Sequence, residues 1–438
     1  MRLNWFSPLP PMASDIGHYS QRILPQLSER SEIRLFADSK GCDLAFLPEV
    51  SSSVPAQILN ESNFDVFNFG NNVDFHAEAW KLSLVRSGLA VLHDLCYQHF
   101  FGMLFLEKLG RPDIYRSLMQ AHYGRAGLEA ADARIGGDAT ALDLAEEFPL
   151  TAAVAVGACG IVHHYPEDLP ERDRLNVPVR SLPLPYASRE LDSEKLFTAR
   201  RQRKVRKIVL FGYLGENRQV RPILRALARS PVKSKIRLEI FGVVSDTLEI
   251  PRLIFELGLE GQVGINGFVS EERLDKSLQD SDLALNLRNP SMGEASGSQL
   301  RIWDNSLASL VSNHQWYAAL PEGTALFVDP GKEEEQLLLH FKRLVEKPEV
   351  YWDIGARGKK NLAENHSPGA YVEKLSEVLV EAVSHRPRLA LDPVLYGLRS
   401  AIFPWWHGVP RSCSLRSTQT LIRSLFGERF AGSIENPT

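Results

Sequence analysis

The chain has 438 residues, of which 44% are hydrophobic and 24% charged, and its formal net charge is −4. This length exceeds what one ordinary hydrophobic core holds and predicts two or three domains, while the lack of a strong positive charge argues against nucleic acid as a partner. There is no apolar leader, no run of 18 apolar residues and no close cysteine pair. We therefore expect a soluble, cytoplasmic protein with reduced thiols, for which contact with a membrane surface stays open.

Short apolar runs alternate with longer amphipathic stretches in the first half, a pattern typical of a parallel sheet with crossover helices. A helix is expected over residues 18–29, and mainly helical structure from about 100 to 155. The expected strands are residues 3–6, 33–37, 65–70, 89–94 and 160–164.

The next stretch has the composition of an interdomain linker. Residues 178–188 contain three prolines, and the last eight positions of 193–207 contain six Arg or Lys. We interpret the basic run as a solvated linker face, with a membrane-surface patch as the alternative.

The second half repeats the pattern, with strands expected at 205–215, 236–244, 262–269, 282–288, 307–313 and 325–330. Two sequential βαβ sets predict two Rossmann-like, doubly wound domains, residues 1–190 and 206–384, that face each other across a cleft. The tail 386–438 has seven Arg against three acidic residues and includes Trp405 and Trp406. It fits either a lipid–water interface or packing against the N-terminal domain.

In open α/β sheets, ligands bind beyond the carboxyl ends of the strands, so the residues that follow each strand are the site candidates. Gly17 stands where a helix should begin after the first strand and would let backbone amides approach an anion or a hydroxyl. His93 follows another strand and could exchange protons with a sugar hydroxyl, or instead cap the next helix.

The most informative segment is residues 286–305, where a predicted strand ends in a loop and a helix begins. Backbone N–H groups and the helix dipole make such a start a site for a diphosphate. Glu294 would accept hydrogen bonds from the hydroxyls of an attached sugar, or instead belong to a helix cap. Arg218 would pair with the pyrophosphate, or instead lie on a helix surface. The small and hydroxyl residues of this predicted anion loop are Gly293, Ser296, Gly297 and Ser298.

These segments resemble the retaining glycosyltransferases of family 4, from residue 1 to about 380. SPLPP–SDIGHYS is similar to that family's SPLPP–SGI–YS opening, VLHD to its VLHD, and GIVHH to its GVIVHS strand. FGYLGENR is similar to FGYINPNK, and NLRNPSMGEASGS to the donor loop NLRYPTMGETSGS. The resemblance implies a GT-B fold and a metal-independent transfer from a nucleotide-activated hexose with retained configuration. No cofactor is implied, because the nucleotide sugar is a substrate.

Carried over residue by residue, the resemblance implies that Gly17 lies near the donor phosphate and the acceptor, and that His93 contacts the transferred sugar. It gives Arg218 the basic phosphate-binding position and Glu294 the contact with the donor sugar. The remaining implied phosphate contacts are Ser296, Gly297 and Ser298.

The chain departs from the family pattern at several positions. Ile302 stands where the motif's second glutamate would be, Asp15 replaces a glycine of the opening loop, and Ala319 replaces a glutamate. Two hypotheses therefore remain. The leading one is a hexosyltransferase of polysaccharide synthesis, acting on a glycan or lipid-linked acceptor; the other is a degenerate GT-B protein that binds a sugar nucleotide or supports a partner transferase. A sugar-nucleotide epimerase is a third interpretation, but it would need additional acidic and basic groups around the sugar, which these candidate residues do not supply.

Overall fold

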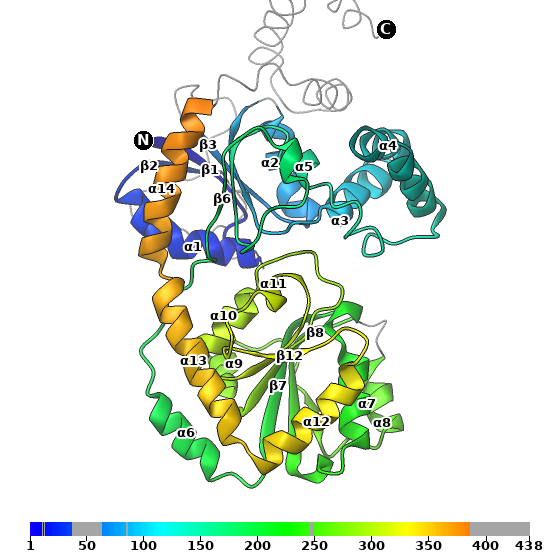
Figure 1. The fold of residues 1–438 in the computed structure, drawn as a ribbon, viewed down its shortest axis with the longest axis vertical. Coiled ribbons are helices and arrows are strands. Elements are labelled where there is room, and N and C mark those ends of the chain that lie inside the picture. Colours follow the sequence, from blue (N-terminus) through cyan, green and yellow to red (C-terminus); the bar gives the residue numbers. More distant parts are fainter. Residues whose placement is uncertain (11, 13, 37–63, 85, 246–248, 386–438) are drawn as a thin grey trace, which may run out of the picture. The chain divides into compact units, whose positions relative to one another are not determined.

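The computed structural model describes residues 1–10, 12, 14–36, 64–84, 86–245 and 249–385. The chain divides into two compact units. The first comprises the described residues of Met1–His163, Glu167–Leu182 and the chain from Val372 to His385, and the second comprises those of His164–Pro166 and Pro183–Tyr371. Each unit is built around its own parallel sheet (Figure 1).

The sheet of the first unit has six parallel strands in the order β2-β1-β3-β4-β5-β6. All residues of β3, β4 and β5 are buried, as expected for central parallel strands covered on both faces. The strands are β1 (Arg2–Phe6), β2 (Glu32–Phe36), β3 (Phe64–Phe69), β4 (Gly88–Leu92), β5 (Ala158–His163) and β6 (Val179–Ser181). The five strands expected in this half are confirmed, whereas β6 lies in the segment that we interpreted as a linker.

The helices of the first unit are α1 (Asp15–Ser28), α2 (Val73–Ser83), α3 (Gln98–Gly102), the π-helix η2 (Met103–Lys108), α4 (Pro112–Gly136), α5 (Thr151–Val154) and the 3₁₀ turn η3 (Arg172–Arg174). The later part of α14 (Pro368–His385) also packs here, because Gly160 of β5 leaves room for it: a Cβ at Gly160 would lie 2.7 Å from the Cβ of Ala382. The second unit accordingly ends at Tyr371, whereas the sequence predicts residues up to 384 in the second domain.

The sheet of the second unit also has six parallel strands, in the order β12-β11-β10-β7-β8-β9. The chain builds β7, β8 and β9 outward and then returns to place β10 on the other side of β7. The carboxyl ends of the neighbouring strands β7 and β10 therefore flank a topological switch point, the place where open α/β sheets bind ligands. The strands are β7 (Arg206–Leu214), β8 (Ile236–Val244), β9 (Val263–Ile265), β10 (Leu283–Asn286), β11 (Ser309–Ser312) and β12 (Leu326–Val328), as expected from the sequence.

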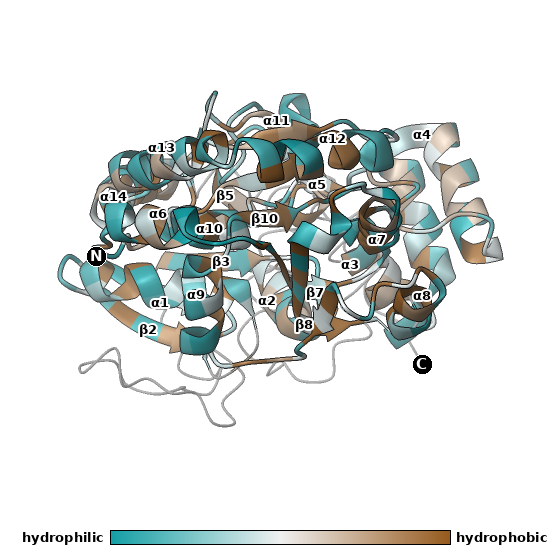
Figure 2. Cartoon of the chain, turned by 90° about the horizontal axis from the view of Figure 1, so that it is seen from below, coloured by the Kyte–Doolittle hydropathy of each residue, from teal (hydrophilic) through white to brown (hydrophobic). Residues whose placement is uncertain are grey.

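Alternation along β7 divides the core of this unit between the two faces of the sheet. Ile208 and Leu210 pack in one apolar cluster with residues of α7, α8, α12 and α13, whereas Val209 and Phe211 pack in another with residues of α9 and α10. Figure 2 shows β7, β8 and β10 as hydrophobic and α9 as largely hydrophilic. The helices and 3₁₀ turns of this unit are α6 (Ser193–Arg201), η4 (Glu216–Arg218), α7 (Val220–Arg229), η5 (Lys233–Lys235), α8 (Ile250–Glu256), α9 (Glu271–Gln279), α10 (Gly297–Asp304), α11 (Gln315–Ala318), α12 (Glu333–Glu346) and α13 (Glu349–Asn365).

The basic run after residue 193 is solvated only in part: Arg201 and Lys204 are exposed, whereas the interpretation as a solvated face was wrong for Arg200. Arg200 of α6 is buried and donates to the carbonyl oxygens of Gln279, Asn305 and Ser306. These carbonyls follow the last turns of α9 and α10, where helices leave acceptors unsatisfied, so the guanidinium caps both ends. A membrane-facing role for Arg200 is equally inconsistent with its burial. The predicted tail 386–438 lies outside the described residues.

Candidate active site

The predicted anion loop lies at the switch point of the second unit. It joins β10 to α10, and Gly293 adopts a φ of +77°, a left-handed conformation that favours glycine. Ser296 is the N-cap of α10, because its Oγ accepts the N–H of Gln299 at 3.1 Å. Gly297 and Ser298 form the first turn of the helix. The loop thus presents a helix N-terminus at the carboxyl edge of the sheet.

Glu294 is fixed inside this loop. Its Oε1 pairs with Arg288, and its Oε2 accepts from Ser291 Oγ at 2.9 Å and from the N–H of Met292 at 2.8 Å. Burial alone would raise the pKa of Glu294, but Arg288 and these hydrogen bonds outweigh it and hold the pKa below its ordinary value. Glu294 is therefore a carboxylate beside the helix start, and it does not cap α10.

Arg218 is also buried, which excludes the surface-helix alternative. The side chain lies in η4 and is 2% exposed. It donates to Asn286 Oδ1 at 3.1 Å and to the carbonyl of Phe211 at 3.0 Å. Burial, together with the nearby Arg288, lowers the pKa of Arg218 to about 10, so it stays charged at neutral pH.

A buried polar network links Arg218 to the cap of α10. Asn286 accepts from Arg218 and donates to Ser296 Oγ at 3.3 Å and to Gln299 Oε1 at 3.1 Å. Gln299 in turn donates to Ser309 Oγ at 2.7 Å. The structure thus brings together Arg218 and the loop residues that the sequence predicted separately.

Sequence reasoning missed Arg288 and Asn286. Asn286 is the last residue of β10, and Arg288 follows two residues later. The rule that identified the other candidates, polar residues just beyond a strand, applies to both. What the sequence did not show is that Arg288 pairs with Glu294 and raises the positive potential around Arg218.

The electrostatics of this switch point favour a bound anion. Two guanidinium groups, Arg218 and Arg288, stand beside one carboxylate, Glu294, and that carboxylate is already paired with Arg288. In the described chain, Arg218 donates hydrogen bonds to neutral groups, the amide of Asn286 and the carbonyl of Phe211, and the hydroxyl of Tyr317 lies beside it. A positive charge at a helix N-terminus is a phosphate-binding arrangement.

His93 belongs to the first unit and follows β4. Its Nε2 lies 3.2 Å from Asn68 Oδ1 of β3. Its ring packs edge-on against Tyr19 of α1, with the two ring centroids 4.6 Å apart. The next helix, α3, begins at Gln98, and Tyr97 is its N-cap, so the alternative of a helix-capping His93 is not what the structure shows. His93 thus lies where β4 ends beside β3.

Gly17 lies in the first turn of α1, near the switch point between β1 and β3. A Cβ there would lie 3.4 Å from Pro8 O and 3.6 Å from the backbone of Leu9, which is ordinary van der Waals contact. The packing of the protein itself therefore does not require glycine at this position. Gly70, after β3, is tighter: a Cβ there would lie 2.5 Å from Ile16 Cδ1 and 3.3 Å from Asp94 Oδ2.

Among the described residues, no group of three His, Cys, Asp or Glu side chains is placed to hold a metal ion. No helix in the described ranges is long and apolar enough to cross a bilayer. The described cysteines, Cys96 and Cys159, are buried and are not joined in a disulfide.

No protein-family model and no curated protein matches the sequence. Solved structures do match the fold. Sucrose-phosphate synthase from Thermosynechococcus elongatus aligns with a TM-score of 0.58 at 14% identity, over 88% of this chain and 99% of that chain. HepE from Anabaena, in complex with UDP, aligns with a TM-score of 0.55 at 14% identity, over 86% and 99%. WaaG, a glycosyltransferase involved in lipopolysaccharide biosynthesis, aligns with a TM-score of 0.50 at 13% identity, over 86% and 99%.

At such low identity the alignments establish the architecture. The predicted fold class is confirmed: the chain has two Rossmann-like α/β units with six-stranded parallel sheets, the architecture of GT-B glycosyltransferases.

Proposed function

We propose that the chain is a glycosyltransferase that moves a hexose from a nucleotide-sugar donor to a glycan or other acceptor, with retention of configuration and without a metal, in polysaccharide synthesis. The observation that carries the proposal is the buried charge of Arg218 beside the N-terminus of α10. A donor diphosphate would supply the negative charge that this switch point lacks.

The parts of such a transfer can be assigned to the two units. In the second, Arg218 and the first turn of α10 would bind the diphosphate and stabilise it as it leaves. Glu294, next to them, would hold hydroxyls of the donor sugar. In the first, His93 would contact the transferred sugar and Gly17 would allow close approach of the donor or acceptor. The partners of Glu294 in the described chain are Arg288, Ser291 and Met292, and none of them is a second carboxylate. This fits a retaining transfer in which the departing phosphate helps to deprotonate the acceptor, rather than the paired carboxylates of a glycosidase.

Isothermal titration with UDP, GDP and ADP tests the donor site directly. UDP is the first probe because HepE, which shares the fold, was solved in complex with UDP. We expect one of these diphosphates to bind, and the corresponding sugar nucleotide to release diphosphate when acceptor is added. NMR of the product then shows whether the anomeric configuration is retained, and activity in EDTA shows whether a metal is needed. Failure of all three diphosphates to bind would refute the proposal.

One observation favours the second candidate, a protein that binds a sugar nucleotide without transferring it. Ile302 is fully buried in the apolar cluster on the α10 side of the sheet, so the position of the motif's second glutamate holds an apolar side chain without polar partners in that cluster. The two candidates separate in a single assay. Binding of a sugar nucleotide without turnover, over a broad panel of acceptors, would support the second.

A further inference from the structure

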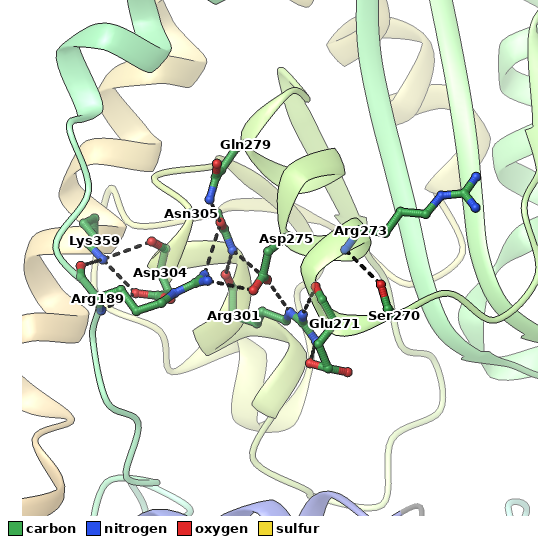
Figure 3. A network of polar contacts seen from close by, with 10 residues as sticks. All are labelled: Arg189, Ser270, Glu271, Arg273, Asp275, Gln279, Arg301, Asp304, Asn305 and Lys359. Carbon is green, nitrogen blue, oxygen red and sulfur yellow. Dashed lines mark hydrogen bonds and ion pairs between the residues drawn. The ribbon is translucent and has the colours of Figure 1, made fainter.

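The carboxyl end of α10 is held by three charged side chains, Arg189, Asp304 and Lys359, which we call the latch (Figure 3). The Asp304 carboxylate is fully buried. It accepts from the N–H of Arg189 at 2.9 Å, from Arg189 Nε at 2.5 Å and from Lys359 Nζ at 2.7 Å. Lys359 also donates to the carbonyl oxygens of Asp304 at 3.0 Å and of Arg189 at 2.5 Å. The latch therefore fixes both the side chain and the main chain where α10 ends.

The latch continues onto α9. Arg189 donates to Asp275 Oδ2 at 2.7 Å, and Arg301 of α10 donates to Asp275 Oδ1 at 2.8 Å and pairs with Glu271. Figure 3 shows these side chains pointing toward one another between α9, α10 and the segment that carries Arg189. Arg189, Arg301 and Lys359 each have a carboxylate partner, in contrast to Arg218 beside the predicted anion loop at the other end of α10. This end of the helix is saturated and needs no ligand.

The latch also joins the two stretches of chain that connect the units. Arg189 follows Pro183, where the chain enters the second unit, and Lys359 precedes Tyr371, where the chain leaves it. The two stretches bond to each other as well: Tyr186 N donates to His366 O at 2.8 Å, and His366 Nδ1 lies 2.8 Å from Leu184 O. Both connections are thereby tied to the end of one short helix.

That helix carries the predicted anion loop at its other end. α10 has eight residues and is about 12 Å long, so a tilt of about 10° at Asp304 displaces its first turn by about 2 Å. Hydrogen bonds weaken steeply over displacements much smaller than this. The orientation of the N–H groups at Gly297 and Ser298 thus depends on how firmly Asp304 is held.

We propose that Asp304 is a positioning residue of the donor site, and that the latch aims the first turn of α10 at the donor diphosphate. The inference rests on the proposed function, since it concerns the same site. Asp304 touches no ligand in this scheme and acts through the helix.

The test compares Asp304→Asn with Asp65→Asn, a matched control in the first unit. Asp65 is also a fully buried carboxylate with three donors, Asn4 Nδ2 at 2.6 Å and the Arg86 fork at 2.6 and 3.1 Å. The affinity of each folded variant for UDP and for UMP is measured by calorimetry, together with the melting temperature. We expect both variants to melt at lower temperature. Only Asp304→Asn should lose affinity for UDP, by about tenfold, with a loss for UMP below about twofold, because the second phosphate is what reaches the helix.

A wild-type ratio of UDP to UMP affinity in Asp304→Asn would overturn the inference and leave the proposed function intact. A wild-type chain that binds no nucleoside diphosphate would overturn both. If Asp304→Asn does not fold, Arg189→Ala takes its place: this side chain is 46% exposed, and its loss removes the Nε donor to Asp304 while leaving Lys359 in position. Arg189→Ala should also lower the ratio of UDP to UMP affinity. An unchanged ratio in this variant would overturn the inference as well.

Discussion

Arg218 and Asn286 share a hydrogen bond of 3.1 Å inside the second unit, so a buried guanidinium has a neutral amide as its partner. Asn286 also donates to Ser296 Oγ, the cap of α10. The charge of Arg218 is thus connected to the helix start through one side chain, and burial lowers its pKa to about 10. A buried cation of this kind costs free energy in the empty protein, and an anion bound beside it recovers that cost.

The first prediction concerns Arg218→Met. Loss of a charged hydrogen bond should weaken UDP binding by about 1.5–3 kcal/mol, while the melting temperature of the ligand-free protein changes little, because a costly buried charge is also removed. Calorimetric titration and scanning calorimetry measure the two effects. Arg86→Met is the control, since it leaves the buried Asp65 carboxylate without its ion pair and should lower stability by about 3–5 kcal/mol with UDP affinity unchanged. Unchanged UDP affinity in Arg218→Met would remove Arg218 from the donor site.

Glu294→Gln separates binding from transfer. The amide oxygen can still accept hydrogen bonds from Ser291 and Met292. The negative charge that pairs with Arg288 is lost, however, so the site becomes more positive. We therefore expect UDP to bind at least as tightly as to the wild type, while transfer falls by about 100-fold, the scale of one lost transition-state contact. Full transfer activity per folded molecule, with a large loss of melting temperature, would show that Glu294 only stabilises the loop.

The same carboxylate should contribute an acid-sensitive part of the stability. The pKa of Glu294 lies below its ordinary value of 4.5 in the folded chain, so the folded state releases its proton more readily than the unfolded state. The stabilisation is complete above about pH 4.5 and is lost as the pH falls through the lower, folded pKa. Denaturant unfolding of wild type and Glu294→Gln across that range should give a stability difference that shrinks toward acid. A difference independent of pH would contradict the depressed pKa.

The strands were predictable because both faces of each sheet are covered, which makes the central strands largely apolar, as in β4 with its sequence GLAVL. β6 was not predicted because it is three residues long and lies within a proline-rich segment. Arg200 was misinterpreted for a different reason. A basic run shows charge, but which helix-end carbonyls lack donors is decided only when α6 meets α9 and α10.

The sequence indicated where the candidate site lies, but it did not indicate which side chains bond to one another there. Position beyond a strand identified Arg218, His93 and Glu294, since parallel topology brings such ends to one edge of a sheet. The partners depend on side-chain directions in the loop. Neither the pairing of Arg288 with Glu294 nor the contact of His93 with Asn68 follows from spacing along the chain.

His93→Ala should affect transfer and leave nucleotide binding unchanged. His93 lies in the first unit, where its partners are Asn68 and Tyr19, whereas the predicted anion loop lies in the second unit. We expect turnover to fall by about 100-fold or more, the range of a lost acid–base or polar contact, with the Kd for UDP within about twofold of wild type. Equal losses in turnover and in UDP affinity would contradict the assigned role.

The last prediction uses two glycines of the first unit that differ in the space around them. A Cβ at Gly17 meets only ordinary contacts, the nearest at 3.4 Å, whereas a Cβ at Gly88 would lie 2.2 Å from the carbonyl oxygen of Asp65. Gly17→Ala should therefore fold with a wild-type melting temperature and, if a donor or acceptor approaches the start of α1 closely, lose transfer activity by about tenfold or more. Gly88→Ala should show the reverse, with a lower melting temperature because the backbone must shift, and wild-type activity per folded molecule. Thermal melts and a transfer assay on the same preparations give both quantities. Wild-type activity in Gly17→Ala would mean that no ligand comes close to this turn, and the role that the sequence motif assigned to Gly17 would then be wrong.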